Sequence, residues 1–262
     1  SLGTLEKLLA GDGPPELRGE VLRALGGYDN REIPALVIGK WKSLSESLRT
    51  EALTLLTGRR DWAEALLGAI ADGKLTRDDL SAPAAQRIAA LKDPQLTAKL
   101  EKTWGSVRQQ TPAEIDDLIK RMRRVVASGK GDAEAGRQVF QLKCATCHKF
   151  NGPGADVGPD ITGADRSVEY LLINILDPNR VVGQPYYTHV VATKSGRIVT
   201  GKLISDAPAG ITLQGENNKI DVIPRDEIDE HAVKNVSVMP EGLPKDMTDQ
   251  QFRDLLEYLR RQ

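Results

Sequence analysis

Residues 144–148 read Cys-Ala-Thr-Cys-His, and this stretch constrains the chain more than any other. Two thiols separated by two residues, with histidine next, form the attachment sequence for c-type haem. Each thiol adds to one haem vinyl group, and the two-residue gap lets one helical turn present both sulfurs to one porphyrin edge. His148 then lies under the iron as the proximal ligand. Because the chain has two cysteines, Cys144 and Cys147, the motif uses both and predicts one covalent haem c.

Two other chemistries use a similar cysteine pair. A thioredoxin-like dithiol requires a strand-to-helix setting and usually has Pro or Gly between the thiols. A zinc site would join the two cysteines and His148 to His189 or His231. Adjacent Cys147 and His148 fit tetrahedral zinc poorly, because neighbouring side chains diverge. Both alternatives remain open from the sequence, and haem is the preferred interpretation.

Length and composition indicate a soluble chain of two domains. The 262 residues can bury two cores, and 40% are hydrophobic and 28% charged. A net charge of −1 gives no electrostatic argument for nucleic acid as a partner. No apolar run approaches the roughly 20 residues that span a bilayer. Covalent haem attachment takes place outside the bacterial cytoplasmic membrane, so we expect a periplasmic or otherwise extracytoplasmic protein whose upstream sequence is missing here.

Residues 1–128 are predicted to form a helical-repeat domain and a linker helix. Residues 17–25 align with residues 48–56 at an offset of 31 (48 − 17), and Leu, Arg and Glu recur in register. A helical period of this length favours an α-solenoid of the HEAT/armadillo kind, with an ordinary helical bundle as the alternative. Helix breaks are expected at the glycines near residues 11–15, 26–27, 57–58 and 72–73. The three tryptophans are expected to fill the core. We expect this domain to serve in scaffolding or docking.

A linker helix is predicted from Thr111 as N-cap, with Pro112 at N1, to about Ala127. The domain boundary is placed at 128/129, before a cytochrome-like domain over residues 129–262. Gly136 and Phe140 precede the haem motif, and Tyr258 lies in the last predicted helix. These residues resemble the first and last helices of class I cytochromes c, which cross closely where a glycine lacks a side chain.

The next familiar segment is residues 158–161, Gly-Pro-Asp-Ile. In cytochromes that it resembles, the carbonyl of the proline accepts the Nδ1–H of the proximal histidine. The resemblance therefore implies that Pro159 orients His148 and raises its basicity. It also places Ile161 among the haem-binding residues. A plain Gly-Pro turn is the alternative.

A β insertion at about residues 186–229 separates these segments from the end of the chain. Four short strands are expected, at 188–193, 197–204, 211–214 and 219–223. The expected fold class is thus mainly α: an α-solenoid-like domain, then a class I cytochrome c fold carrying a four-stranded β insertion. The insertion is expected to shield the haem edge or to meet a partner.

Met239, in the Gly/Pro-rich segment 236–244, resembles the distal ligand of class I cytochromes. It lies 91 residues after His148 (239 − 148), which requires the β insertion to loop out. His231 and His189 are rival ligands, and an open site is a further alternative. A His/Met pair, His148 with Met239, would give a higher potential than two histidines.

Residues 132–262 resemble the C-terminal haem domain of large secreted proteins from planctomycetes and verrucomicrobia. The matching segments are residues 136–140, 157–160, 175–178, 202–213 and 238–243. In that family helical repeats often precede the cytochrome, and dehydrogenase-like domains can lie further upstream. The resemblance implies a one-electron carrier, not an enzyme, with a dehydrogenase-type partner or module. A peroxidase-like haem enzyme with an open distal site and a zinc-stabilised interaction module are the alternatives.

Overall fold

The computed structural model describes residues 3–4, 8–9, 14–108 and 111–261, and the chain forms two compact units, residues 1–109 and 110–262. The division lies at 109/110 rather than at the 128/129 expected from sequence. The linker helix, α8 (Ala113–Ala127), belongs to the second unit because its apolar side chains Ile119 and Met122 are buried in that unit's core. The glycine-rich break after α8 is therefore a turn within a unit.

Helices α2 to α7 build residues 15–103 of the first unit. They are α2 (Pro15–Leu25), α3 (Ile33–Gly39), α4 (Glu46–Leu56), α5 (Arg60–Ala71), α6 (Ala82–Ala90) and α7 (Pro94–Thr103), with 3-10 turns at Trp41–Ser43 and Arg77–Asp79 and a short strand, β1 (Gly105–Val107). The predicted breaks at 26–27, 57–58 and 72–73 are confirmed, since Gly26, Thr57 and Asp72 are the C-caps of α2, α4 and α5. Of the break at 11–15, residues 11–13 lie outside the described part of the chain.

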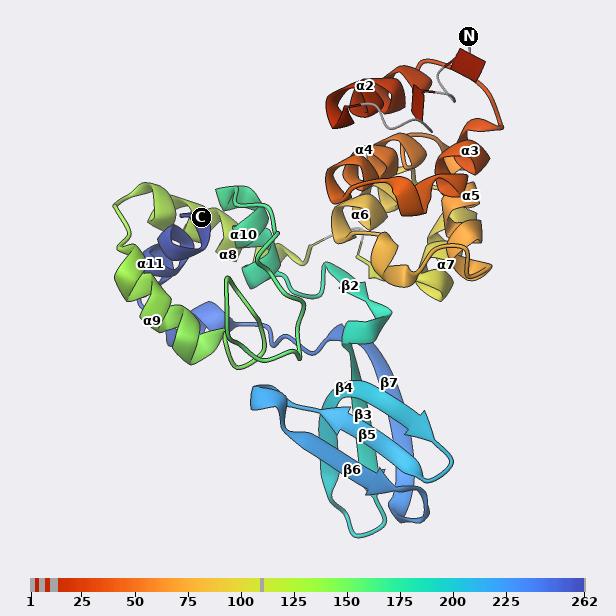
Figure 1. Ribbon diagram of the computed structural model, residues 1–262. Coiled ribbons are helices and arrows are strands. Elements are labelled where there is room, and N and C mark those ends of the chain that lie inside the picture. The colour runs from red at the N-terminus through yellow and green to blue at the C-terminus, as the bar shows by residue number, and fades with distance from the viewer. Residues whose placement is uncertain (1–2, 5–7, 10–13, 109–110, 262) are drawn as a thin grey trace. The chain divides into compact units, whose positions relative to one another are not determined.

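Several helices of the first unit pack on the next helix but one. Helix α2 packs on α4, α3 on α5, and α5 on α7, whereas α6 packs on its sequence neighbour α7 (Figure 1). The two copies of the sequence repeat are α2 and α4, whose starts and ends are both offset by 31 residues (46 − 15 and 56 − 25). The tryptophans Trp41, Trp62 and Trp104 are buried, as expected for core residues.

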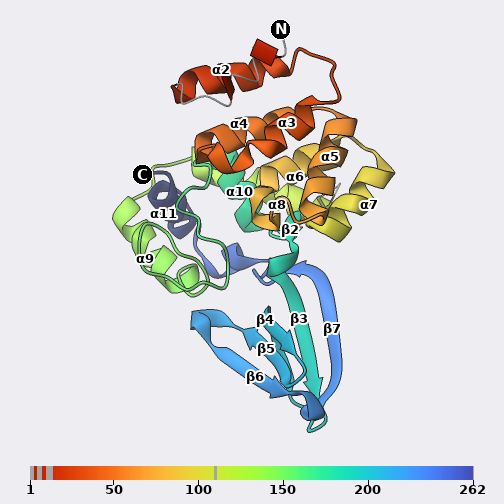
Figure 2. The ribbon, with the colours of Figure 1, turned by 45° about the vertical axis from the view of Figure 1, so that its right-hand side comes forward.

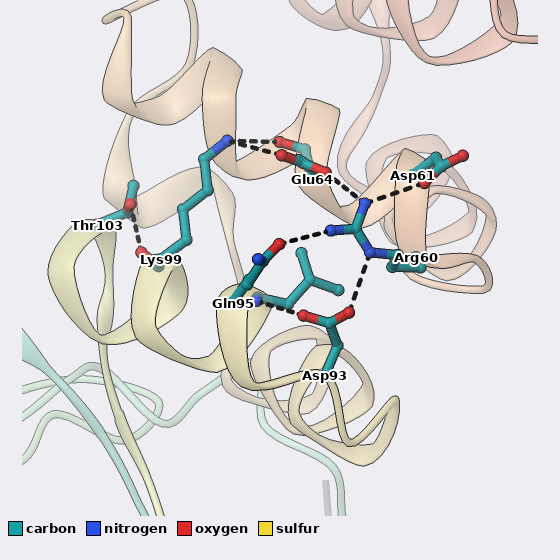
Figure 3. Close-up of polar contacts among 8 residues, drawn as sticks. Arg60, Asp61, Glu64, Asp93, Gln95, Lys99 and Thr103 are labelled. Carbon is teal, nitrogen blue, oxygen red and sulfur yellow. Dashed lines mark hydrogen bonds and ion pairs between the residues drawn. The ribbon is translucent and has the colours of Figure 1, made fainter.

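A polar cluster joins α5 to the start of α7 (Figure 3). Arg60 donates to Asp93 at 3.0 Å and to Glu64 at 2.7 Å. Asp93 is the N-cap of α7 and accepts the N–H of Leu96 at 2.9 Å, and this bond together with Arg60 lowers the pKa of its carboxyl. The cluster is exposed, so its contribution is mainly to fix the direction in which α7 leaves the turn.

The helices of the second unit surround one core. They are α8, α9 (Ala133–Lys143), α10 (Val168–Leu176) and α11 (Asp249–Arg260). Helix α8 begins one residue later than predicted, with Pro112 rather than Thr111 at the N-cap. The Thr111 hydroxyl instead donates to Asp177, at 2.7 Å, just after the end of α10. A tertiary bond thus replaces the local cap.

The β insertion has five strands rather than the four expected. They are β3 (Tyr187–Thr193), β4 (Ile198–Ala207), β5 (Gly210–Gln214), β6 (Ile220–Pro224) and β7 (Ile228–Ser237), in the antiparallel order β6-β5-β4-β3-β7 (Figure 2), and a short strand, β2 (Val181–Gly183), precedes them. The additional strand, β7, was missed because it starts in an acidic run and is mostly exposed, so it lacks the apolar alternation of a half-buried strand. With β7 the insertion extends to Ser237 rather than to residue 229.

Candidate functional site

The Cys-Ala-Thr-Cys-His motif forms a turn at the end of α9. Cys144 is the C-cap of that helix. The N–H groups of Cys147 and His148 both donate to the Cys144 carbonyl, at 3.0 and 2.8 Å. This single turn brings both thiols and the imidazole to the same cavity.

Helix α9 is held by a close crossing with α11. Both views place the two helices side by side (Figures 1 and 2). A side chain at Gly136 would collide with the Asp254 carbonyl and would lie 2.8 Å from Cβ of Tyr258. The rings of Phe140 on α9 and Tyr258 on α11 pack against each other at a centroid distance of 5.7 Å. The predicted crossing, with its glycine and aromatic residues, is confirmed.

A buried carboxylate closes the same crossing. Asp254 is 5% exposed, and its Oδ1 accepts the N–H of Asp132 at 2.8 Å and an amide N–H of Gln250 at 2.7 Å. Asp132 in turn caps α9 through the N–H groups of Glu134 and Ala135. The chain end thereby positions the helix that carries the motif.

His148 is oriented by the segment predicted to do so. Its Nδ1 lies 2.8 Å from the Pro159 carbonyl oxygen. A carbonyl only accepts, so Nδ1 carries the proton and the lone pair is on Nε2. The ring packs on Gly158, where a Cβ would lie 2.8 Å from Nδ1 and from Nε2. Burial lowers the pKa of His148, which favours the neutral ring that a metal requires.

The two thiols lie in apolar surroundings. Burial raises the pKa of the Cys144 thiol to about 12. Burial also raises the pKa of the Cys147 thiol, against the effect of the Thr146 hydroxyl. A redox-active dithiol has a depressed pKa instead. These surroundings therefore disfavour the dithiol and suit an apolar prosthetic group.

The cavity brings together all six residues singled out from the sequence. It is lined by Cys144, Cys147, His148, Pro159, Ile161 and Met239, with apolar side chains of α10 and of the segment after it. The residues present thus fit haem, because both thiols, one imidazole and one thioether converge on one largely apolar space.

The rival ligands His189 and His231 lie in the β insertion, on β3 and β7, and pair with each other. Nδ1 of His189 is 2.9 Å from Nε2 of His231, and the rings stack. Neither histidine is among the described residues that line the cavity. No group of three or more His, Cys, Asp or Glu able to hold a metal ion occurs among the described residues, so the four-ligand zinc site is not formed.

The insertion loops out and also returns to the motif. Its base is closed by a bond of 3.0 Å from the Val238 N–H to the Tyr186 carbonyl. The turn between β5 and β6 reaches the haem motif, where the Asn217 N–H donates to the Thr146 carbonyl at 2.8 Å. Lys202 of β4 donates to the Asp156 carbonyl at 2.9 Å. The sequence predicted strands at 211–214 and 219–223 on the two sides of this turn but not the partner of the turn, because backbone contacts between distant segments leave no local pattern.

Comparison with known families bears on this cavity. Residues 133–188 match the cytochrome c family model. Members of this family bind haem c covalently, and the presence of Cys144 and Cys147 in the matched segment is consistent with such an attachment site. The match supports a haem-binding, electron-transfer role. The match ends just after β3 begins, so it includes the proximal side but not Met239. No curated protein matches the chain. Within the described residues, no helix is long and apolar enough to cross a membrane.

Proposed function

We propose that the second unit is a mono-haem electron carrier in which His148 and Met239 would bind the iron. The observation that carries this proposal is the convergence of both thiols, the oriented imidazole and one thioether on a single cavity. When bound, the haem iron takes up and releases one electron between Fe(III) and Fe(II).

Each residue has a distinct part in this proposal. Cys144 and Cys147 would hold the haem covalently through thioether links, each made by addition of a thiol S–H across one vinyl double bond. His148 presents Nε2 while its Nδ1–H is held by Pro159, which raises the basicity of the ring. Ile161 and the apolar lining exclude water, and Met239 supplies a soft ligand that stabilises the ferrous state.

The first unit is proposed to be a HEAT/armadillo-like docking scaffold. The packing of α2 on α4, α3 on α5 and α5 on α7, together with the 31-residue offset between α2 and α4, supports this assignment. A dehydrogenase-type protein or upstream module is the proposed electron donor, by resemblance to the planctomycete-type haem domain. The need to attach haem covalently supports an extracytoplasmic location.

Absorption spectroscopy on the haem-loaded full chain tests the ligand pair. In the ferric state we expect a low-spin spectrum with a sulfur-to-iron band near the red edge of that spectrum. On reduction we expect sharp α and β absorption bands. Met239→Leu should abolish that band because leucine has a similar volume but no sulfur. The matched control is Met247→Leu, a partly buried methionine that packs on the core of the same unit, which should retain the band.

Three other results would overturn the assignment. A sulfur-to-iron band that persists in Met239→Leu would remove this residue as ligand. A high-spin ferric spectrum that responds to small anions would favour the haem enzyme with an open distal site. Zinc in place of iron, in protein matured with haem-attachment machinery, would favour the zinc-stabilised module.

A further inference from the structure

One asparagine holds the loop that carries Met239 on both sides of that residue. Asn179 Oδ1 accepts the N–H of Ser237 at 2.7 Å. Its Nδ2 donates to Glu241 Oε1 at 2.6 Å. Ser237 and Glu241 stand two residues before and two residues after Met239. We propose that Asn179 is a positioning residue for the distal ligand, an inference that rests on the proposed ligation by Met239.

The turn that presents Asn179 is itself rigid. Asp177 is 1% exposed, and its Oδ2 accepts the Thr111 hydroxyl at 2.7 Å. The N–H of Arg180 returns to the Asp177 carbonyl at 3.0 Å, which closes the turn around Asn179. Pro178 has a fixed φ and is buried at the edge of the cavity. The amide of Asn179 is therefore anchored to the core of the unit.

The loop has three further bonds, and all lie on its N-terminal side. The Thr188 hydroxyl donates to the Ser237 carbonyl at 3.0 Å. The Val238 N–H donates to the Tyr186 carbonyl, and the Met239 N–H donates to the Ser237 hydroxyl, each at 3.0 Å. Gly242, at a φ of +83°, then turns the chain towards α11. Among the described partners of residues 237–241, Asn179 alone reaches both sides of Met239. Without it, the C-terminal half of the loop loses its link to the core.

The chemistry of a thioether makes this link important. A neutral sulfur is a weaker ligand than an imidazole nitrogen. The fraction of molecules in which the Met239 sulfur is bound to the iron therefore depends on how much conformational entropy the loop loses on binding. A loop that is already fixed at both ends loses little entropy. Removing the link favours the open loop and hence any competing ligand. Asn179 thus raises the effective concentration of the thioether without touching it.

Imidazole competition on the ferric, haem-loaded full chain tests the proposal. Asn179→Ala should weaken the sulfur-to-iron band and tighten imidazole binding about tenfold, the effect of roughly one net hydrogen bond. Asn179→Asp keeps the acceptor for Ser237 but sets a carboxylate against Glu241, so its imidazole affinity should fall between those of the wild type and Asn179→Ala. The matched control is Asn235→Ala, an exposed asparagine of β7, which should bind imidazole like the wild type.

The outcomes separate this proposal from the one on which it rests. A wild-type protein without the sulfur-to-iron band overturns the ligand assignment and the role of Asn179 with it. A wild-type band together with unchanged imidazole affinity in Asn179→Ala overturns the role of Asn179 alone. Should Asn179→Ala fail to take up haem, Glu241→Ala carries the test, because Glu241 is exposed and its loss removes only the second half of the link.

Discussion

Replacing Gly136 by alanine should destabilise the second unit by separating α9 from α11. The added Cβ would meet the Asp254 carbonyl and would lie 2.8 Å from Cβ of Tyr258. Carbon atoms pack at about 3.5–4.0 Å, so the helices must part by roughly 1 Å. Overpacking of this kind costs about 1–3 kcal/mol, and the contact with immobile backbone places Gly136 in the upper part of that range.

The helix itself gains about 0.5–1 kcal/mol from alanine, which leaves a net loss of about 2 kcal/mol. In a unit of this size, that loss lowers the Tm by about 4–8 °C. The two units can be followed separately in thermal melts. Haem absorbance reports on the second unit, whereas Trp41, Trp62 and Trp104 all lie in the first, so tryptophan fluorescence reports on that unit.

The control is the same substitution where space exists. Gly68 lies inside α5, and the nearest atom to its added Cβ is Lys99 Nζ at 3.7 Å. Gly68→Ala should leave the fluorescence melt unchanged or raise its midpoint. A second unit that is as stable in Gly136→Ala as in the wild type would refute the argument that the crossing requires glycine.

Two further predictions concern histidines. Gly158→Ala would place a methyl group 2.8 Å from Nδ1 of His148. Because the ring must then shift and weaken its hydrogen bond to Pro159, the reduction potential of the holoprotein should rise. An unchanged reduction potential with full haem content would contradict this. Burial and His231 lower the pKa of His189, against the opposing charge of Asp206. The folded state therefore favours the neutral ring, and its stability should be full above the unfolded pKa of about 6.5 and decline below it. In His189→Gln the Tm of the second unit should fall less between about pH 7.5 and 5 than in the wild type, and equal falls would contradict the reasoning.

Local chemistry made much of the site predictable. The spacing of Cys144, Cys147 and His148 depends on one helical turn, so neighbouring residues contain all the information. The bond from His148 to Pro159 also follows from a short segment, and it is present at 2.8 Å. Helix ends at glycine-containing breaks were predictable for the same reason, because the backbone conformation is decided within a few residues.

Other expectations failed where distant segments compete with local ones. Thr111 was expected to cap α8 but donates to Asp177 instead. The boundary expected at 128/129 followed a local glycine break, whereas the apolar face of α8 packs in the second unit. Strand β7 lacks an apolar alternation of its own. It forms because its backbone pairs with that of β3 along the length of the strand.

The sequence by itself determined the haem c motif, the residue proposed as proximal ligand and the helices that flank them, since each depends on residue type and short spacing. Only the tertiary structure placed Met239 in the cavity and paired His189 with His231 away from it. It also brought Asn179 to both sides of the distal loop, across 58 and 62 residues of chain. The physical reason is that a ligand's position relative to distant residues is set by packing and hydrogen bonds between segments, and these leave no periodic trace in the chain.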